Sequence, residues 1–289
     1  MKRIVAWIMS ACVATAASAQ SISMPQSVEE PASSEDPNAI NSDELADVIR
    51  RGQLIYYHDW AAAATSDVLI EQVPPERRQL VRGWVELWQD RIFTVYYYGS
   101  DGNGRFVVAS MDFGTEGVTN VAIPAPDDRQ ALPPDAIPYA EARDAALNAA
   151  ANSGYGLCSG PSPNTVVIPS EPEGTISVYI LSPQTQNDVF QAGGHYRYDV
   201  GPDGEIEDHR RFMNSCLALG AENDGTGNPE AVGYGISHLL DPHPTEIHIF
   251  LSLLSRRLIS VVTTENGLIW MIRNGRFVSK DEDPSSEND

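Results

Sequence analysis

The spacing of hydrophobic residues along the chain predicts helices first and strands afterwards. Ser42 followed by two acidic residues is typical of a helix start, and we expect a first helix from Asp43 to about Tyr56. The alanine-rich segment from His58 to Leu69 predicts a second helix that ends before Pro74. Four apolar residues support the first of these helices by their near-helical spacing: Leu45, Val48, Ile49 and Ile55.

The pattern then changes to one typical of strands. Residues 76–87 have mixed spacing, which we interpret as a helix up to Gly83 and a strand after it. The run from Ile92 to Tyr98 is β-branched and aromatic, six turn-forming residues follow from Gly99, and apolar residues resume at Phe106. This pattern predicts a hairpin. The row of tyrosines could serve as a binding platform, but we interpret it as the half-buried face of an antiparallel sheet.

A proline-rich stretch from Val121 to Tyr139 separates this region from a second one. Tyr139 to Ala151 is a strong helix former, and Gly201 to Gly204 predicts a hairpin turn between two later strands. Four strand-like runs follow the helix: Thr165–Ile168, Thr175–Leu181, His195–Val200 and Glu205–Phe212. The fold class is therefore predicted as α+β, with N-terminal helices and an antiparallel sheet in a domain at 42–123. A second half at 139–279 would combine a helix with an antiparallel meander.

The ends of the chain carry different signals. Lys2-Arg3, the apolar run from Ile4 to Ala17 and Ala17-Ser18-Ala19 together have the form of a secretory signal peptide, predicted at 1–19. The apolar run is too short for a permanent membrane anchor. The protein is thus expected to be soluble and periplasmic or secreted. A lipoprotein, cleaved before Cys12, is the alternative. Residues 20–41 predict a disordered tether, and residues 280–289 an acidic tail.

The net charge of the chain argues against two classes of partner, nucleic acids and membranes. The formal net charge is -21, and a surface this acidic repels phosphate backbones and anionic lipids. We therefore expect no nucleic-acid partner and no membrane insertion.

Removal of the leader leaves Cys158 and Cys216, which in an oxidising compartment predict a structural disulfide. A bridge across roughly 60 residues would stabilise the fold by about 4 kcal/mol.

Two resemblances concern the second half and the whole chain. Glu141 to Ala146 in the helix and Tyr198 to Ile206 in the hairpin resemble a PepSY-like module over residues 139–212. Such modules in exported proteins are binding or inhibitory, so this resemblance implies binding and no catalysis. The whole chain also resembles exported proteobacterial proteins with no assigned activity, and that resemblance implies no function. It rests on three stretches: Asn164 to Val167, Gly193 to Arg197 and His238 to His248.

The histidine-rich stretch is the main candidate for chemistry. Imidazoles and a carboxylate are common ligands of zinc and other divalent metals. The histidines are five residues apart, however, and Pro242 and Pro244 prevent a regular helix there. We interpret the stretch as a structural turn, with Thr245 capping the segment that follows. The alternative is a metal site with four ligands: His238, Asp241, His243 and His248.

A second, weaker candidate is the Gly193 to Arg197 segment, where His195 and Arg197 would lie on one face of a strand and could bind an anion. No recognised catalytic motif occurs in the chain, so no catalytic residue is assigned. We expect an exported binding or envelope-housekeeping protein without a cofactor. The sequence does not identify its partner, and an envelope protein or peptide is one candidate. A metal-dependent hydrolase that uses the histidine stretch is the alternative.

Overall fold

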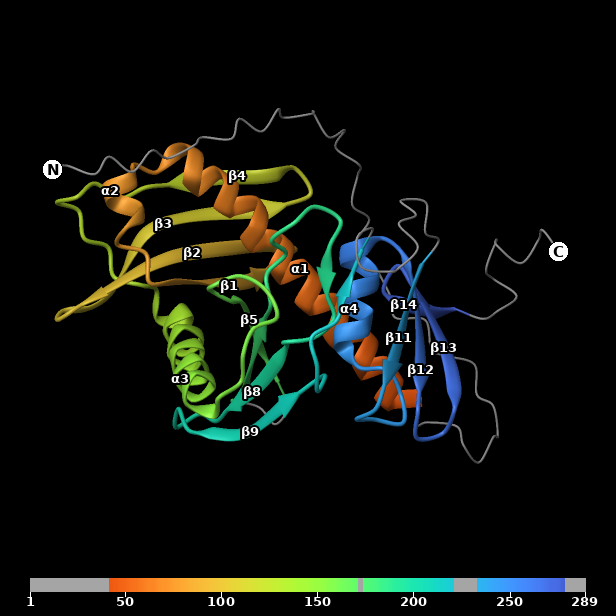
Figure 1. Ribbon diagram of the computed structural model, residues 1–289. Coiled ribbons are helices and arrows are strands. Elements are labelled where there is room, and N and C mark those ends of the chain that lie inside the picture. Colours follow the sequence, from red (N-terminus) through yellow and green to blue (C-terminus); the bar gives the residue numbers. More distant parts are fainter. Residues whose placement is uncertain (1–41, 171–173, 221–232, 279–289) are drawn as a thin grey trace, which may run out of the picture.

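The computed structural model describes residues 42–170, 174–220 and 233–278, in which helices and sheets form an α+β fold (Figure 1). The predicted leader (1–19), tether (20–41) and acidic tail (280–289) lie outside the described residues. The α+β prediction is confirmed.

Helix α1 (Ser42–Gln72) is one continuous helix of 31 residues, so the prediction of two helices is wrong. The segment from Tyr56 to Trp60, where the break was expected, contains no proline or glycine and continues the buried stripe with His58. The helix ends before Pro74, as expected. Beyond it, α2 (Pro75–Arg78) is only one turn long, and the strand that follows begins at Gly83.

The first sheet is an antiparallel meander of four strands in the order β1-β2-β3-β4. The second half of α1 covers one face of this sheet, and the short helix η1 (Pro134–Ala136) with the start of α3 covers the other. The predicted hairpin is confirmed. The strands are β1 (Gly83–Gln89), β2 (Ile92–Asp101), β3 (Gly104–Gly114) and β4 (Gly117–Ala122).

The tyrosine row of β2 alternates between these two cores. Tyr97 packs towards α1 and donates its hydroxyl hydrogen to the Ala62 carbonyl at 3.2 Å, whereas Tyr98 packs on the opposite face. Both side chains are buried. The tyrosine row thus belongs to an antiparallel sheet, as predicted, but its side chains lie on two opposite faces and not on one.

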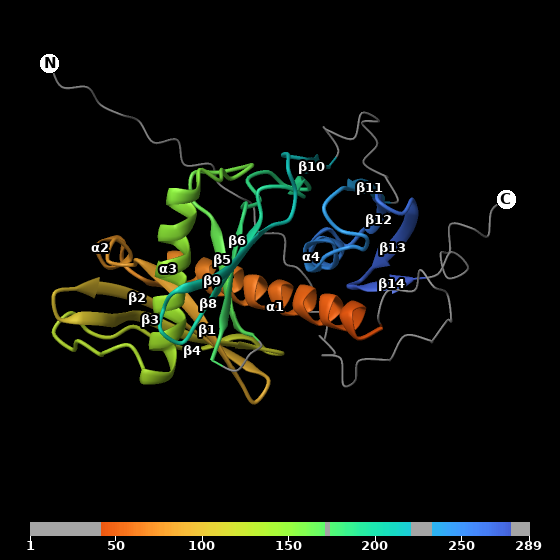
Figure 2. The same ribbon diagram turned by 90° about the horizontal axis from the view of Figure 1, so that it is seen from below.

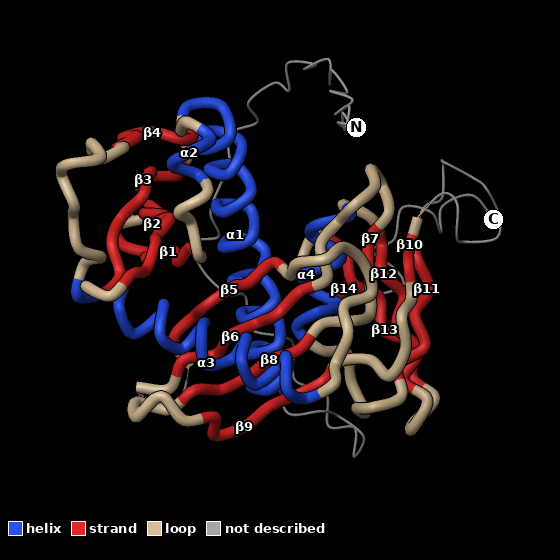
Figure 3. The backbone as a smooth tube through the Cα atoms, turned by 60° about the vertical axis from the view of Figure 1, so that its left-hand side comes forward, coloured by secondary structure: helices blue, strands red, loops and turns tan. Residues whose placement is uncertain are grey.

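The second sheet follows helix α3 (Ile137–Ser153) and also matches the prediction. Its strands form an antiparallel meander in the order β5-β6-β8-β9. α3 covers one face, while the first half of α1 and helix α4 (Glu246–Ser255) cover the other (Figure 3). The strands are β5 (Asn164–Pro169), β6 (Ile176–Leu181), β8 (Tyr196–Val200) and β9 (Ile206–Arg211); the short β7 (Phe190–Gln191) pairs with β10 (Ala218–Leu219).

The C-terminal unit is a feature that the hydrophobic pattern did not reveal. Strand β11 is parallel to β12, and α4 connects them, before two further strands complete an antiparallel edge. Parallel strands need such a crossover because a tight turn can only reverse the chain. The elements are β11 (Gly233–His238), α4 (Glu246–Ser255), β12 (Leu258–Thr263), β13 (Leu268–Arg273) and β14 (Arg276–Val278).

Helix α1 links the three sheets, because it runs from α4 to the first sheet (Figures 1 and 2). Gly52 permits the α1–α4 contact: a Cβ at this position would lie 2.4 Å from the Cβ of Ile249. The proposed domains at 42–123 and 139–279 stay a prediction. Within the described residues, the first half of α1 packs in the core of the second region.

Candidate functional site

The predicted histidine stretch runs from the end of β11 into α4, and its three histidines have separate roles. The Nε2 atom of His238 lies 2.7 Å from an Asp241 oxygen, and the Arg210 guanidinium donates to the same oxygen at 2.6 Å. Burial alone would raise the pKa of Asp241, but the hydrogen bond from His238 and the charge of Arg210 hold it below its ordinary value. This arrangement joins the β11 end to strand β9.

His248 completes the start of α4. Its Nδ1 atom accepts the backbone N–H of Thr245 at 2.9 Å, and Thr245 in turn caps the helix, which forms a capping box. Burial lowers the pKa of His248 to about 3, with the nearby His238 acting in the same direction. The ring is therefore neutral at physiological pH and serves as a hydrogen-bond acceptor. The prediction that Thr245 caps the following segment is confirmed.

His243 turns away from the other two histidines. Its Nε2 atom lies 2.9 Å from a carboxylate oxygen of Glu44 on α1, and its Nδ1 donates to the Pro244 carbonyl at 2.8 Å. Throughout 42–170, 174–220 and 233–278, no three histidine, cysteine or acidic side chains are placed to hold a metal ion. The ligand set of the metal alternative (His238, Asp241, His243 and His248) is therefore not assembled.

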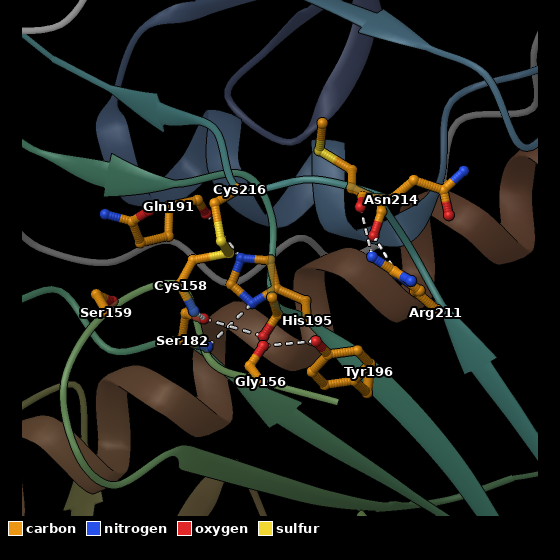
Figure 4. Close-up of a disulfide and its surroundings, with 12 residues drawn as sticks. Gly156, Cys158, Ser159, Ser182, Gln191, His195, Tyr196, Arg211, Asn214 and Cys216 are labelled. Atoms are coloured by element: carbon orange, nitrogen blue, oxygen red, sulfur yellow. Dashed lines mark hydrogen bonds between the residues drawn. A yellow bond between two sulfur atoms is a disulfide. The ribbon is translucent and has the colours of Figure 1, made fainter. Parts of the chain in front are cut away.

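His195 and Arg197 are also engaged within the fold. The backbone N–H of Ser182 donates to Nδ1 of His195 at 3.3 Å, and Nε2–H donates to the Gln191 carbonyl at 2.7 Å (Figure 4). Burial lowers the pKa of His195 to about 4, so the ring is neutral. Arg197 pairs with Glu246 and Asp199, each at 3.1 Å. Anion binding by these two residues would have to displace these partners.

Cys158 and Cys216 form the predicted disulfide (Figure 4). Beside it lies a hollow of about 160 Å³, in which the rings of Tyr155 and Tyr196 stack 4.8 Å apart. The Tyr196 hydroxyl donates to the Gly156 carbonyl at 2.6 Å, and the Arg211 guanidinium donates to the carbonyls of two neighbouring residues. The polar side chains here are held by the protein itself, which is typical of a structural region around a disulfide.

A different kind of site lies where α1 crosses the β1–β2 end of the first sheet. Here aromatic side chains from four elements line a pocket, which we call the aromatic pocket. Trp60 packs edge-on against Phe113 with ring centres 5.3 Å apart, and Trp88 packs on Phe93 at 4.5 Å. The lining residues are Tyr57, Trp60, Trp88, Arg91, Phe93, Phe113, Gly114 and Thr115.

The aromatic pocket adjoins a wider hollow of about 480 Å³ between the β1–β2 and β3–β4 turns, since Arg91, Gly114 and Thr115 line both. The outer wall is open to solvent: Trp88 is 44% exposed and Ile92 is 42% exposed. Large apolar groups at the rim of a hollow are common features of binding sites.

The two-residue turn between β1 and β2 carries the one charged side chain that lines the aromatic pocket, Arg91. Asp90 and Arg91 have φ angles of 51° and 68°, the region that such a turn requires and that glycine or asparagine normally occupies. Within the residues that the structure describes, the side chain of Arg91 forms no hydrogen bond or ion pair. It is an exposed, unpaired guanidinium beside aromatic rings.

The sequence patterns did not point to this site, although two signals were present. Two residues between strand-like runs indicate a tight turn, and Arg91 is an unusual residue in one. The rings that meet in the pocket, however, lie between Tyr57 and Phe113 in the chain, and no local spacing connects them.

Comparisons with protein-family models, with curated proteins and with solved structures find no match for this chain. Among the helices that the structure describes, none combines the length and apolar character needed to cross a membrane.

Proposed function

We propose that this chain is an exported, non-catalytic binding protein whose ligand binds in the aromatic pocket and the hollow beside it. The observation that carries the proposal is the unpaired Arg91 on a left-handed turn beside five aromatic rings, with Trp88 exposed. The disulfide and the predicted leader support a periplasmic or secreted location, since disulfides persist in oxidising compartments.

Energetic considerations favour a functional reason for this arrangement. A non-glycine residue in the left-handed region costs about 1 kcal/mol or more, and Arg91 bears that cost, whereas aspartate, as at Asp90, adopts this region more readily. Glycine or asparagine would relieve the strain, so stability does not explain Arg91. Trp88, at 44% exposure, also forgoes about half of the 1.5–3 kcal/mol that full burial of a large apolar side chain contributes. A bound ligand would shield the ring of Trp88 from solvent and would interact with the guanidinium of Arg91.

The test is a titration with N-phenyl-1-naphthylamine, a neutral aromatic probe whose emission rises in apolar surroundings. We expect saturable binding to the mature protein. Because Trp88 supplies an exposed ring at the mouth of the pocket, Trp88→Ala should weaken binding by about tenfold. Leu239→Ala, which removes another exposed apolar side chain (67% exposed), is the matched control and should bind like the wild type.

Two outcomes would contradict the proposal. One is that the probe does not bind at micromolar to millimolar concentration. The other is that Trp88→Ala and Leu239→Ala bind it equally, because the probe would then occupy a different surface.

A further inference from the structure

We propose that the aromatic pocket takes small carboxylates that bear a single aromatic ring. The ring would stack on Trp88 at the mouth of the pocket, and the carboxylate would pair with Arg91. This inference rests on the proposed function and adds the chemical class of the ligand.

The size of the site favours a small ligand. The aromatic pocket has a volume of only about 20 Å³, too small to enclose a ring, so a ligand ring would lie against the exposed face of Trp88. The rest of the ligand would extend into the adjoining hollow of about 480 Å³. Aromatic rings prefer offset or edge-on contacts, and Phe113 already packs edge-on against Trp60 beside the pocket.

The charge of the site favours a carboxylate. Arg91 is the charged residue of the aromatic pocket, and its planar guanidinium can donate two parallel hydrogen bonds to one carboxylate. Asp90 and Glu116 line the wider hollow and are not among the residues that line the aromatic pocket. The net charge of -21 acts mainly over distances at which salt screens it, because the Debye length is about 8 Å at physiological ionic strength. The charge of Arg91, which lines the pocket, therefore favours a carboxylate over a neutral or cationic ligand group.

The strained turn supports the same assignment. Arg91 has a φ of 68°, which fixes the backbone direction at the pocket rim. An arginine whose backbone is fixed by a tight turn needs less backbone ordering on binding than one on a flexible loop, and less ordering means higher affinity.

The experiment uses three ligands with the same ring and different charge: 3-phenylpropionate, 3-phenylpropionamide and 3-phenylpropylamine. Affinities are measured by calorimetry and by displacement of N-phenyl-1-naphthylamine from the mature protein. We expect the carboxylate to bind about fivefold more tightly than the neutral amide, and the amine most weakly, since one charge-assisted pair at a half-exposed site contributes about that factor.

Arg91→Asn separates charge from folding, because asparagine adopts the same left-handed conformation with less strain than arginine. It should melt at the same or a higher temperature than the wild type, and it should bind carboxylate and amide equally. Arg276→Gln, which removes an exposed arginine from β14, should keep the fivefold preference.

The outcomes distinguish the two proposals. If the amide or the amine binds as well as the carboxylate, or if Arg91→Asn keeps the preference, the carboxylate assignment is overturned and the binding site stands. If the neutral probe binds at the pocket and none of the three ligands competes, the ligand class is again overturned. If neither the probe nor the three ligands bind, the proposed function fails as well.

Discussion

Glu86 on β1 occupies an unusual position for a carboxylate. Its side chain is fully buried, and neither oxygen accepts a hydrogen bond from the described residues. His58 on α1 lies 3.5 Å away, and its ring packs edge-on against Phe93, which lines the aromatic pocket. Burial raises the pKa of neighbouring Asp59 to about 6, against a hydrogen bond from Asn164 that lowers it, and the charge of Glu86 contributes to the rise. These polar groups lower the stability of the junction between α1 and the first sheet.

Replacing Glu86 with an apolar residue of similar length should therefore stabilise the protein. We expect Glu86→Met to raise the free energy of unfolding at pH 7 by about 1–3 kcal/mol, because a buried carboxyl group whose oxygens accept no hydrogen bond is removed. Urea unfolding measures this difference. Glu116→Gln, at an exposed acid in the β3–β4 turn, should leave the stability unchanged. A less stable Glu86→Met would show that the carboxylate has favourable partners in solution.

At the scale of elements, α4 illustrates how one short helix depends on its capping residues. Ten residues do not form a stable helix alone, so α4 relies on packing and on the Thr245–His248 box. The box requires a neutral imidazole, since its Nδ1 atom accepts a hydrogen bond. Because the folded pKa of His248 is about 3 and the ordinary value is 6.5, the unfolded chain takes up the proton first as the pH falls. Stability from this residue is present above pH 6.5 and is lost between about pH 6.5 and 3.

We expect the titration of His248 to lower the free energy of unfolding by about 3 kcal/mol between pH 7.5 and pH 4. His248→Gln should reduce this loss, because the glutamine oxygen can accept the Thr245 N–H and does not titrate. At pH 7.5 it should stay within about 1 kcal/mol of the wild type, whereas His248→Ala should lose about 1 kcal/mol with the cap. Urea unfolding at both pH values measures how much the free energy of unfolding falls between them. An equal fall in His248→Gln and the wild type would contradict the role assigned to the imidazole.

At the scale of the whole molecule, one covalent bridge and one long helix hold distant segments together. The disulfide closes a span of 58 residues and joins the loop after α3 to the loop after β9. Next to it, the N–H of Ala192 donates to the Leu217 carbonyl at 2.8 Å, beside the β7–β10 pair. The bridge thus fixes the loops that surround His195.

Removing the bridge should destabilise the protein by about 2–4 kcal/mol, since the unfolded chain regains the entropy of an open loop. The double variant Cys158→Ser/Cys216→Ser avoids a lone thiol, and urea unfolding compares it with the oxidised wild type. The mature wild type, denatured without reductant, should contain close to zero free thiols. Two free thiols per chain, or equal stability of the double variant, would contradict a structural disulfide.

The sequence by itself determined the features that depend on neighbouring residues. Alternating apolar residues and the Gly201–Gly204 turn predicted the meander of the second sheet, because side chains in a strand alternate between its faces. The proline pair after Gln72 ended α1, and the pairing of Cys158 with Cys216 followed from their number and compartment. The turn interpretation of the histidine stretch likewise rested on local spacing and on two prolines.

Only the tertiary structure decided which distant residues meet. The continuity of α1 depends on packing against partners far along the chain, such as Ile249 beside Gly52, and no local pattern indicates such a contact. The parallel pairing of β11 and β12 has the same origin. The aromatic pocket and the Glu86–His58 pair combine α1 with the first sheet. Periodicity shows which face of an element is buried, whereas the partner that covers it is set by topology and close packing of the whole chain.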